Sequence, residues 1–301
     1  MRLTAFGSAA GFLEAVRPTL AEHEAEHHLV LGVAEAIAST PASDSRLLAL
    51  AVEDEHGLAL AAVMTPLRPL LIASDRRGDV ISTAASAMWE AIDAARFSPS
   101  HVIGGVEQVE PLVTARAQHG AGHARVVMHQ RVYRLTKVEP VSSACGVLRQ
   151  ATRADLDLVL EWVSAFEREA LAAILPQSPR AVVERRIAAG ELYLWCDPDP
   201  RTMAGWARPT RRAVAVNGVY TPAEWRGRGY ATACVAELSA RLLERFEFCV
   251  LYTDLGNPTS NAIYTRIGYR PVRDFLMYAL GREGSESRGI SSLHRPAGAT
   301  N

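Results

Sequence analysis

The sequence lacks the features that mark several protein classes. It contains no CxxC pair, and its four cysteines are far apart in the chain: Cys145, Cys196, Cys234 and Cys249. This spacing indicates neither a disulfide framework nor a zinc site, so we expect free, buried thiols. No apolar run approaches the ~18 residues that a membrane span requires, and the first residues make a poor signal peptide. These absences predict a cytoplasmic protein with no membrane partner.

Positive and negative side chains are also nearly balanced. Lys and Arg together number 32, Asp and Glu number 33, and the formal net charge at pH 7 is −1. A nucleic-acid-binding domain normally carries a basic stripe or excess, so the balance argues against such a partner. Lysine is almost missing, because Lys137 is the only one. We interpret the preference for arginine as compositional bias.

Length and hydrophobic content indicate two domains. A chain of 301 residues that is 49% hydrophobic buries a sizeable core, and ~100–200 residues per domain is usual. Each half predicts the same order: helices, a strand hairpin, a strand, a helix, a strand, a helix and a strand. The turn-rich segment EPVSSACG separates the halves, so we place a boundary near residue 142. The predicted class is α/β, with a mixed sheet flanked by helices in residues 1–142 and in 143–280, and a disordered Gly/Ser-rich tail over 281–301.

The segment TPAEWRGRGYATA, residues 221–233, joins a predicted strand to a predicted helix through two glycines. Such a turn usually receives a phosphate, because the free main-chain amides at a helix N-terminus attract anions. A dinucleotide-binding loop reads G-x-G-x-x-G directly after the strand, but Thr232 replaces the third glycine and TPAEWR separates the strand from the first. A Walker A loop requires Gly-Lys, and no lysine is near. Both of these loops are therefore excluded.

A pyrophosphate bound without recognition of a base or ribose fits the segment better. Gly229 lets the backbone turn and approach a ligand closely, and Ala231 keeps the side chain small at the contact. We expect the amides around Arg228 to Thr232 to point at the phosphate, with charge-assisted contacts from Arg226 and Arg228. These features predict a phosphate cradle over residues 226–232.

A second group of polar residues lies downstream, in NPTSNAIYTRIGYRP. Asn257 and Tyr264 are seven residues apart, so nearly two helical turns place them on one face. An asparagine amide can pair with an amide-rich ligand, and a phenol can donate a proton. The structural alternatives are Asn257 as a helix N-cap before Pro258 and Tyr264 packed in an apolar face. Asn261 faces either the ligand or solvent.

These residues resemble the GNAT superfamily of acyl-CoA-dependent N-acetyltransferases. The family's signature, Gln/Arg-x-x-Gly-x-Gly/Ala at a strand–helix junction, is matched by RGRGYA, residues 226–231. Asn257, Tyr264 and the pair Gly268-Tyr269 match a second family element at the expected separation. The resemblance covers residues 145–280, whereas residues 1–140 share only the order of elements. It implies a GNAT fold in the C-terminal half, preceded by a degenerate GNAT-like or accessory domain.

The resemblance also implies a co-substrate and roles for individual residues. Acetyl-CoA would be the acyl donor, without a metal, and the amine of a small molecule or peptide would be the acceptor. The family's strand-edge, phosphate-loop and downstream contacts to CoA map onto Gly218, Val219, Tyr220, Arg226, Gly227, Arg228, Gly229, Tyr230, Ala231, Thr232, Asn257 and Asn261. The family's tyrosine protonates the departing thiolate, which makes Tyr264 the general acid. A main-chain amide near Val219 or Tyr220 would polarise the acyl carbonyl.

One position departs from the family. Several members carry a catalytic glutamate five residues before the asparagine, where this chain has Tyr252. Tyr252 cannot act as a carboxylate base, so Asp254, Glu224 or ordered water are the substitutes. The departure supports a second hypothesis, a CoA-binding sensor or scaffold that has lost catalysis. A third hypothesis makes the N-terminal half an interaction module that presents or selects the acceptor.

A zincin-like pattern also occurs near the N-terminus. His23-Glu24-x-x-His27 matches HExxH on a predicted helix, but His28 points about 100° away from His27 and offers no third ligand. We therefore assign no metal site to it. The acceptor amine cannot be identified from these motifs, because they define the chemistry of the site and not its specificity. We also allow for a homodimer.

Overall fold

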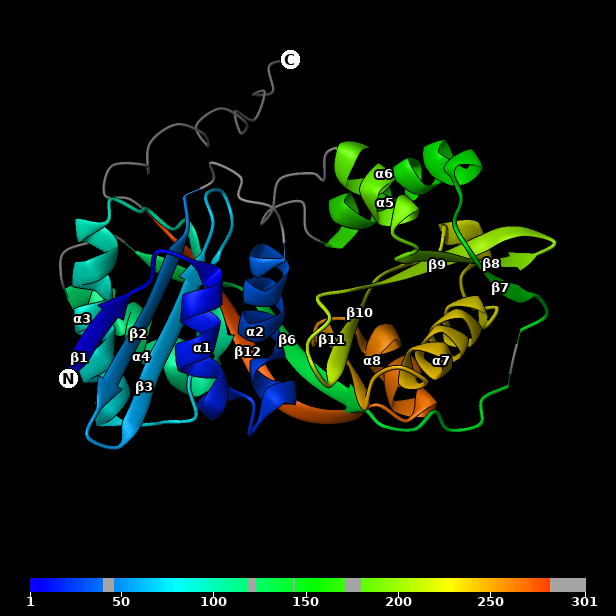
Figure 1. Cartoon of the computed structure of the whole chain (residues 1–301). Helices are drawn as coiled ribbons and strands as arrows, with labels where there is room; N and C mark the ends of the chain where they lie inside the picture. Colours follow the sequence, from blue (N-terminus) through cyan, green and yellow to red (C-terminus); the bar gives the residue numbers. More distant parts are fainter. Residues whose placement is uncertain (40–45, 119–122, 143, 171–179, 282–301) are drawn as a thin grey trace, which may run out of the picture.

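One twelve-stranded sheet runs through the described part of the chain (Figure 1). The computed structural model describes residues 1–39, 46–118, 123–142, 144–170 and 180–281. Neighbouring strands follow the order β1-β2-β3-β4-β5-β12-β6-β11-β10-β9-β8-β7. Their bounds are β1 Arg2–Ala5, β2 Leu48–Asp54, β3 Gly57–Met64, β4 Leu70–Ala73, β5 His101–Gly105, β6 Ala124–Leu135, β7 Val147–Gln150, β8 Leu192–Asp197, β9 Asp199–Ala207, β10 Ala213–Tyr220, β11 Phe248–Asp254 and β12 Arg270–Leu280.

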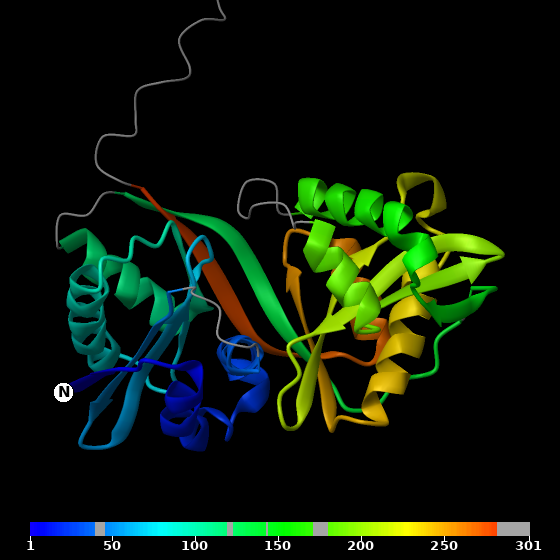
Figure 2. The same ribbon diagram turned by 45° about the horizontal axis from the view of Figure 1, so that its top comes forward.

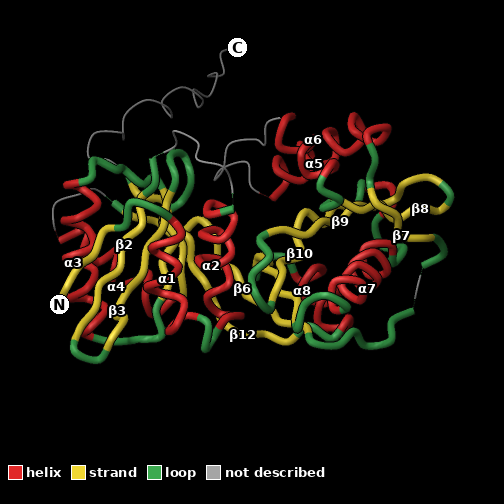
Figure 3. Tube along the Cα trace, in the orientation of Figure 1, coloured by secondary structure: helices red, strands yellow, loops and turns green. Residues whose placement is uncertain are grey.

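Helices cover both faces of this sheet (Figure 3). Buried side chains alternate along the strands, so each face has its own apolar clusters. One face carries α1 (Ala9–Leu20), α2 (Glu24–Ala38), α5 (Leu156–Ala170) and α6 (Arg180–Ala188). The other carries α3 (Asp79–Ala94), α4 (Val106–Gln118), α7 (Tyr230–Leu243) and α8 (Pro258–Ile267). Among the described residues, every helix is too short or too polar to span a bilayer.

Local sequence signals set several helix ends. Thr152 and Asp155 form a capping box in the turn that leads into α5. α8 begins after Asn257, whose side chain accepts a hydrogen bond from the N–H of Ser260. It ends at Gly268, where φ is 111°, a left-handed conformation that favours glycine. Local sequence therefore determines where α5 begins and where α8 begins and ends.

The two halves exchange their last strands. β6, the last strand of the first half, pairs with β11 of the second half, beginning with Leu135 opposite Cys249. β12, the last strand of the second half, pairs with β5 of the first half, beginning with Phe275 opposite Gly105. β6 and β12 also pair with each other and cross the middle of the molecule side by side (Figure 2). Each half therefore completes the sheet of the other.

The N-terminal helices, the first strand and the C-terminal tail differ from, or lie outside, the sequence predictions. The sequence from residue 10 to about 39 predicts helix broken once near Pro18, and the structure has two helices, with the break at residues 21–23. Pro18 lies in the last turn of α1, where the buried side chains Phe12, Val16 and Leu20 keep the helix continuous. β1 was not predicted, because four residues show too little periodicity. The tail expectation, from residue 282 on, falls outside the described residues.

The predicted boundary near residue 142 lies in the connection between β6 and β7. The sheet is continuous across it, because β6 lies before the boundary and pairs with β11 after it. The division into residues 1–142 and 143–280 remains a prediction about folding units. Below, these two parts are called the first half and the second half.

Candidate active site

β10 and β11 are parallel neighbours that separate toward their C-terminal ends. Their pairing ends at Ala215 opposite Val250. Both strands continue beyond it, β10 to Tyr220 and β11 to Asp254. On the side of β11, the last main-chain groups of β10 therefore lack a strand partner in the described part of the chain. An extended, amide-rich ligand can pair with such groups as an added strand.

An irregularity in β10 turns its main chain in the separated segment. The register with β9 shifts between Asn217 and Tyr220. Gly218, within this bulge, has a φ of 61°, which glycine adopts without strain. A bulge leaves main-chain groups out of the strand ladder and re-aims them. The predicted residues Gly218, Val219 and Tyr220 are thus brought together beside the separated strands.

The predicted phosphate loop follows β10 through the 3-10 helix η2 (Ala223–Trp225) and leads into α7. Gly227 and Gly229 have φ values of 76° and 83°, and Gly229 is the N-cap of α7. No acceptor among the described residues meets the N–H groups of residues 227–232, and the first helical bond is donated by Ala233. Unpaired amides at a helix N-terminus form an anion site. The main chain of residues 227–232 therefore presents free amides at the N-terminus of α7.

The two arginines of the loop differ in their surroundings. Arg226 pairs with Glu169 at 2.7 Å, so its charge is already balanced. Arg228 lies over the ring of Trp225, 4.8 Å from the centroid, and has no carboxylate partner in the described ranges. Arg201 lies over the same ring at 3.9 Å. Of the two predicted arginines, Arg228 is the one free to contact a phosphate directly.

Two further loop residues offer only their main chain. The hydroxyl of Tyr230 donates to Oδ2 of Asp197 at 2.7 Å, and this hydrogen bond raises the pKa of Tyr230. Tyr230 and Thr232 are both buried. The bond from Tyr230 ties α7 to β8 and holds the start of the helix in place. Sequence reasoning missed Asp197, because nothing in the sequence pairs it with position 230.

Tyr264 lies on α8 with its ring in the core between α8 and the sheet. It packs against Tyr269, with ring centroids 6.0 Å apart, in a cluster that includes Val216 and Leu251. Burial raises the pKa of Tyr264 to about 12, and a hydrogen bond with Ser260 partly opposes the rise. The phenol keeps its proton at neutral pH, as a general acid must. The same burial makes it a weaker proton donor.

The two asparagines of α8 both make structural hydrogen bonds. Asn257 caps the helix, which is the alternative that its position before Pro258 suggested. Asn261 donates to the carbonyl oxygens of Asp254 at 3.0 Å and Asn257 at 2.8 Å. Its Oδ1 accepts from the hydroxyl of Tyr133 at 3.1 Å. The amide of Asn261 is therefore fully used in joining α8 to β11 and β6.

The candidate bases differ in burial. Tyr252, where the family often has glutamate, has a buried hydroxyl with no hydrogen-bond partner, and burial raises its pKa. Asp254 is exposed, and its Oδ1 accepts from the N–H of Gly256 at 2.8 Å. Glu224 is exposed in η2. None of the three is a buried carboxylate poised beside β10.

The corresponding place in the first half is filled by protein side chains. β4 and β5 are parallel there, and Arg273 of β12 reaches the end of β4 with only 10% of its side chain exposed. Its guanidinium donates to the carbonyl oxygen of Ser74 at 3.3 Å and to Glu107 at 3.1 Å. Gln108 also accepts from Arg273 and donates to the carbonyl oxygen of Arg76 at 2.7 Å. Arg273, on the exchanged strand β12, and Gln108 therefore occupy the place at the end of β4 that corresponds to the separated end of β10 in the second half.

The side chains of the HExxH pattern contact other residues of the protein, and the ligand atoms of Glu26, His27 and Asp75 lie within 4.8 Å of one another. His23 is the N-cap of α2, so it lies just outside the helix. Nε2 of His27 is 2.8 Å from Oδ1 of Asp75. The carboxylate of Glu24 is buried and accepts from the hydroxyl of Thr210, in the turn between β9 and β10. These contacts fasten α2 to both halves.

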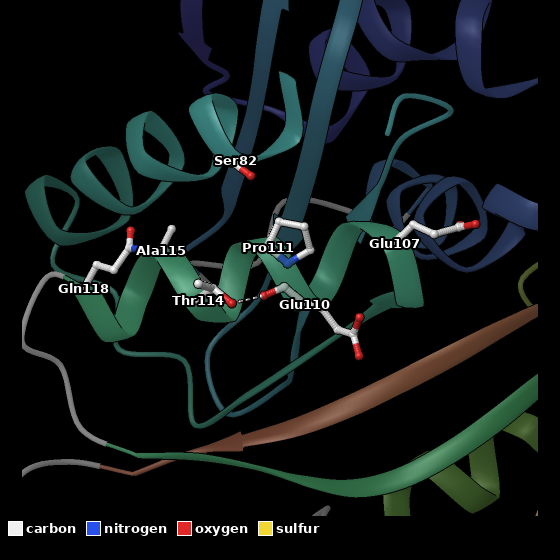
Figure 4. Close-up of a pocket in the computed structure, with 7 residues that line it drawn as sticks. All are labelled: Ser82, Glu107, Glu110, Pro111, Thr114, Ala115 and Gln118. Carbon is white, nitrogen blue, oxygen red and sulfur yellow. Dashed lines mark hydrogen bonds between the residues drawn. The ribbon is translucent and has the colours of Figure 1, made fainter. Parts of the chain in front are cut away.

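A surface depression of about 370 Å³ lies on the first half, beside α4 (Figure 4). Its lining is Ser82, Glu107, Glu110, Pro111, Thr114, Ala115 and Gln118. The hydroxyl of Thr114 donates to the carbonyl oxygen of Glu110 at 2.9 Å, which is an ordinary bond within the helix. The depression does not include the phosphate loop or α8, so we assign it no part in the site.

Comparison with known proteins agrees with this geometry. Residues 195–276 match the family model described as FR47-like protein. A GCN5-related N-acetyltransferase from Sphaerobacter thermophilus is 18% identical, with a TM-score of 0.58, over 92% of this chain and 94% of that one. The chain has the GNAT fold.

Further GNAT structures show the same likeness. A GCN5-related N-acetyltransferase from Kribbella flavida is 16% identical over 89% of this chain and 99% of that one, with a TM-score of 0.56. A tandem GNAT protein from the clavulanic acid biosynthesis pathway is 13% identical over 95% and 99%, with a TM-score of 0.52. No curated protein matches the chain. The predicted fold, two tandem GNAT-like halves, is confirmed.

Proposed function

We propose that this GNAT chain is an N-acyltransferase that uses acetyl-CoA, bound in its second half. One observation carries the proposal: the separated end of β10 leads directly to a helix N-terminus whose amides are free. The pantetheine arm would pair with the main chain of residues 218–220. The pyrophosphate would lie on the amides of residues 227–232, beside Arg228. The acceptor would be an amine of a small molecule or a peptide.

The proposed reaction is direct transfer. The neutral amine attacks the thioester carbonyl, a C–N bond forms, the C–S bond breaks, and the departing thiolate takes up a proton. A main-chain amide at the bulge, near Val219 or Tyr220, would stabilise the charge that develops on the carbonyl oxygen. Tyr264 would supply the proton to the thiolate. An ordinary thiol has a pKa of about 8.5, so donation from a phenol of pKa about 12 is uphill.

Deprotonation of the amine is proposed to run through water. Tyr252 is excluded as a base, because burial keeps its hydroxyl protonated. Asp254 is exposed, and one of its oxygens is engaged in a turn. An amine that loses its proton to solvent reacts faster as the pH rises toward its own pKa. The rate should therefore increase with pH through the neutral range.

A sensor or scaffold that binds CoA without turnover is the second candidate. The buried, unpaired hydroxyl of Tyr252 in place of a carboxylate favours it. Free thiol released on incubation with acetyl-CoA and a panel of amines distinguishes the two. Thiol release that depends on an amine supports the enzyme, and CoA binding without release supports the sensor.

Calorimetric titration with CoA tests the cofactor site. Gly229→Ala places a Cβ in the cradle, and its nearest neighbour in the protein would be Ala144 at 3.8 Å. Gly57→Ala is the matched control, because φ is 100° there and nothing lies within 4 Å. Each substitution should cost about 1–2 kcal/mol of stability, because both glycines have positive φ. Only Gly229→Ala should weaken CoA binding, by roughly tenfold or more.

Two results would contradict the assignment. If the unmodified protein does not bind CoA, the proposed function fails. Equal CoA affinities for Gly229→Ala and Gly57→Ala would remove the loop from the cofactor site.

Tyr264→Phe tests the general acid separately. Loss of a catalytic proton donor lowers kcat by roughly 10²–10⁴-fold, and the affinity for CoA should stay unchanged. Phenylalanine keeps the packing against Tyr269, so the fold should be preserved. Unchanged turnover would remove the acid role and leave the acyl transfer itself standing.

A further inference from the structure

Four buried polar atoms without a hydrogen-bond partner belong to three side chains near the junction of the two halves. They are Nε of Arg208, the hydroxyl of Tyr252, and Nδ1 and Nε2 of His28. In the described part of the chain, only Nε of Arg273 shares this property. Buried polar groups are nearly always hydrogen-bonded, so a group of unpaired ones needs a physical reason.

α2 brings these side chains together. A Cβ placed on Gly32 would lie 2.8 Å from Cβ of Arg208 and 3.4 Å from Cε1 of His28, so a glycine is required for this approach. Tyr252 packs edge-on against Phe275 on the same face, with ring centroids 5.9 Å apart. Burial and then the charge of Arg208 lower the pKa of His28 to about 3, while an interaction with the main chain of Arg208 opposes the fall. The same charge, and an interaction with the main chain of Leu29, oppose the rise in the pKa of Tyr252. The three side chains therefore share one electrostatic environment.

Arg208 has no carboxylate partner among the described residues. It follows β9 with a φ of 54°, which is uncommon for a residue other than glycine. The nearby Arg186 pairs with Glu191 at 3.2 Å and donates to Oδ1 of Asn217 at 2.9 Å. Burial lowers the pKa of Arg208, and the positive charge of Arg186 lowers it further. Nε of Arg208 is buried although the residue as a whole is partly exposed, so its charge lacks a counter-charge that a bound anion would supply.

The position of the group connects it to the proposed acyl transfer. Tyr252 lies two residues beyond Val250, the last residue of β11 that pairs with β10. Asn217, the partner of Arg186, lies two residues beyond the last paired residue of β10. Ala213, Ala215 and Val250 share one buried face with Tyr252, opposite the face that α7 covers. Arg208, Tyr252 and His28 thus lie beside the separated ends of β10 and β11, on the face of the sheet opposite α7.

We propose that Arg208, Tyr252 and His28 bind a carboxylate of the acceptor, so that the substrate is an amino acid or another amine that carries a carboxylate. Each side chain can donate: Nε–H of Arg208, the hydroxyl of Tyr252 and the one N–H of neutral His28. A carboxylate accepts several hydrogen bonds through its two oxygens, so a single one can satisfy all three donors. The inference rests on the proposed function and specifies its substrate class.

Matched acceptors test the proposal on the full-length protein. Glycine, β-alanine and 4-aminobutanoate are compared with the amides of the same acids, with thiol release from acetyl-CoA giving kcat/KM. At least one acid should exceed its amide by roughly 100-fold or more, because a site that bonds a polar group rejects analogues that lack it. The three chain lengths then show how far the amine lies from the carboxylate.

Two variants and one control assign the preference to residues. Arg208→Met should reduce the preference to less than about tenfold and leave CoA affinity unchanged, and Tyr252→Phe should reduce it less. Arg211→Met, exposed on the same turn between β9 and β10, should keep the full preference. Removing a partly exposed cation that has no counter-charge should not unfold the protein. If Arg208→Met nevertheless fails to fold, the preference for acids over amides in Tyr252→Phe is compared with that of the unmodified protein, and this comparison decides the assignment.

The outcomes separate this proposal from the function on which it rests. Equal rates with acids and amides, or no turnover of any acid, overturn the carboxylate site even if CoA binds. If Arg208→Met keeps the full preference for acids over amides, the carboxylate site is also overturned. The same result in Tyr252→Phe overturns it when Arg208→Met does not fold. Absence of CoA binding in the unmodified protein contradicts the proposed function itself.

Discussion

Asn261 joins three elements through one amide, so Asn261→Ala should destabilise the protein. Its Nδ2 donates to carbonyl oxygens at the end of β11 and at the start of α8. Its Oδ1 accepts from the hydroxyl of Tyr133 on β6, the strand that the first half contributes to the second. The resemblance to the GNAT family assigned Asn261 to the cofactor. The hydrogen bonds indicate a structural role, and the substitution separates the two.

The size of the effect follows from the three bonds. The two carbonyl bonds lie at the surface, where a lost hydrogen bond costs about 0.5–1 kcal/mol. The third leaves the hydroxyl of Tyr133 without an acceptor, and Tyr133 is only 4% exposed. An unsatisfied buried donor costs about 1–3 kcal/mol. Alanine regains about 0.5 kcal/mol of helix propensity, so the expected net loss is about 1.5–4.5 kcal/mol.

Urea unfolding and calorimetric titration with CoA measure the two roles. Asn257→Ala is the matched control on the same helix, where one capping bond to Ser260 is lost at a cost of about 1 kcal/mol. Tyr133→Phe combined with Asn261→Ala gives a double-mutant cycle, with an expected coupling of about 1 kcal/mol. An unchanged urea midpoint for Asn261→Ala, together with tenfold weaker CoA binding, would refute the structural role.

Two further predictions concern burial and strand exchange. The pKa of His28 is about 3 in the folded protein and about 6.5 in the unfolded chain, so the unfolded chain binds more protons between these values. Stability should therefore fall with decreasing pH by up to about 1.4 kcal/mol per pH unit in this window. His28→Leu should make the fall shallower, and an unchanged slope would contradict the burial. A fragment of residues 143–281 lacks both partners of β12, so it should aggregate or remain unfolded by circular dichroism, unlike residues 124–281, which retain β6. A folded, monomeric 143–281 fragment would contradict the importance of the exchange.

The conformation of the proposed phosphate loop was predictable because it is decided locally. Gly227 and Gly229 take positive φ in the structure, and the helix begins where the sequence changes to helix-forming residues. The capping pair Thr152 and Asp155 was predictable for the same reason. Each of these features is decided within a few residues of the chain, where steric limits on φ and the free amides of a helix end dominate.

The partners of the loop side chains were not predictable. Arg226 meets Glu169, 57 residues earlier, and Tyr230 meets Asp197, 33 residues earlier. Such contacts depend on how helices pack on the sheet, and no local pattern encodes them. Tertiary contacts therefore distinguish Arg226, which pairs with Glu169, from Arg228, which has no carboxylate partner among the described residues.

The sequence by itself determined that there are two similarly ordered halves, where the phosphate loop lies, and that the loop suits neither a dinucleotide nor a nucleoside triphosphate. Only the tertiary structure decided that β6 and β12 change places, because a strand's partner is chosen by burial and register over more than a hundred residues. The same exchange carries Arg273 into the first half, while α2 brings His28 to Arg208 and Tyr252. Local sequence defines the conformation of the proposed phosphate site, whereas the proposed acceptor site depends on long-range packing between the halves.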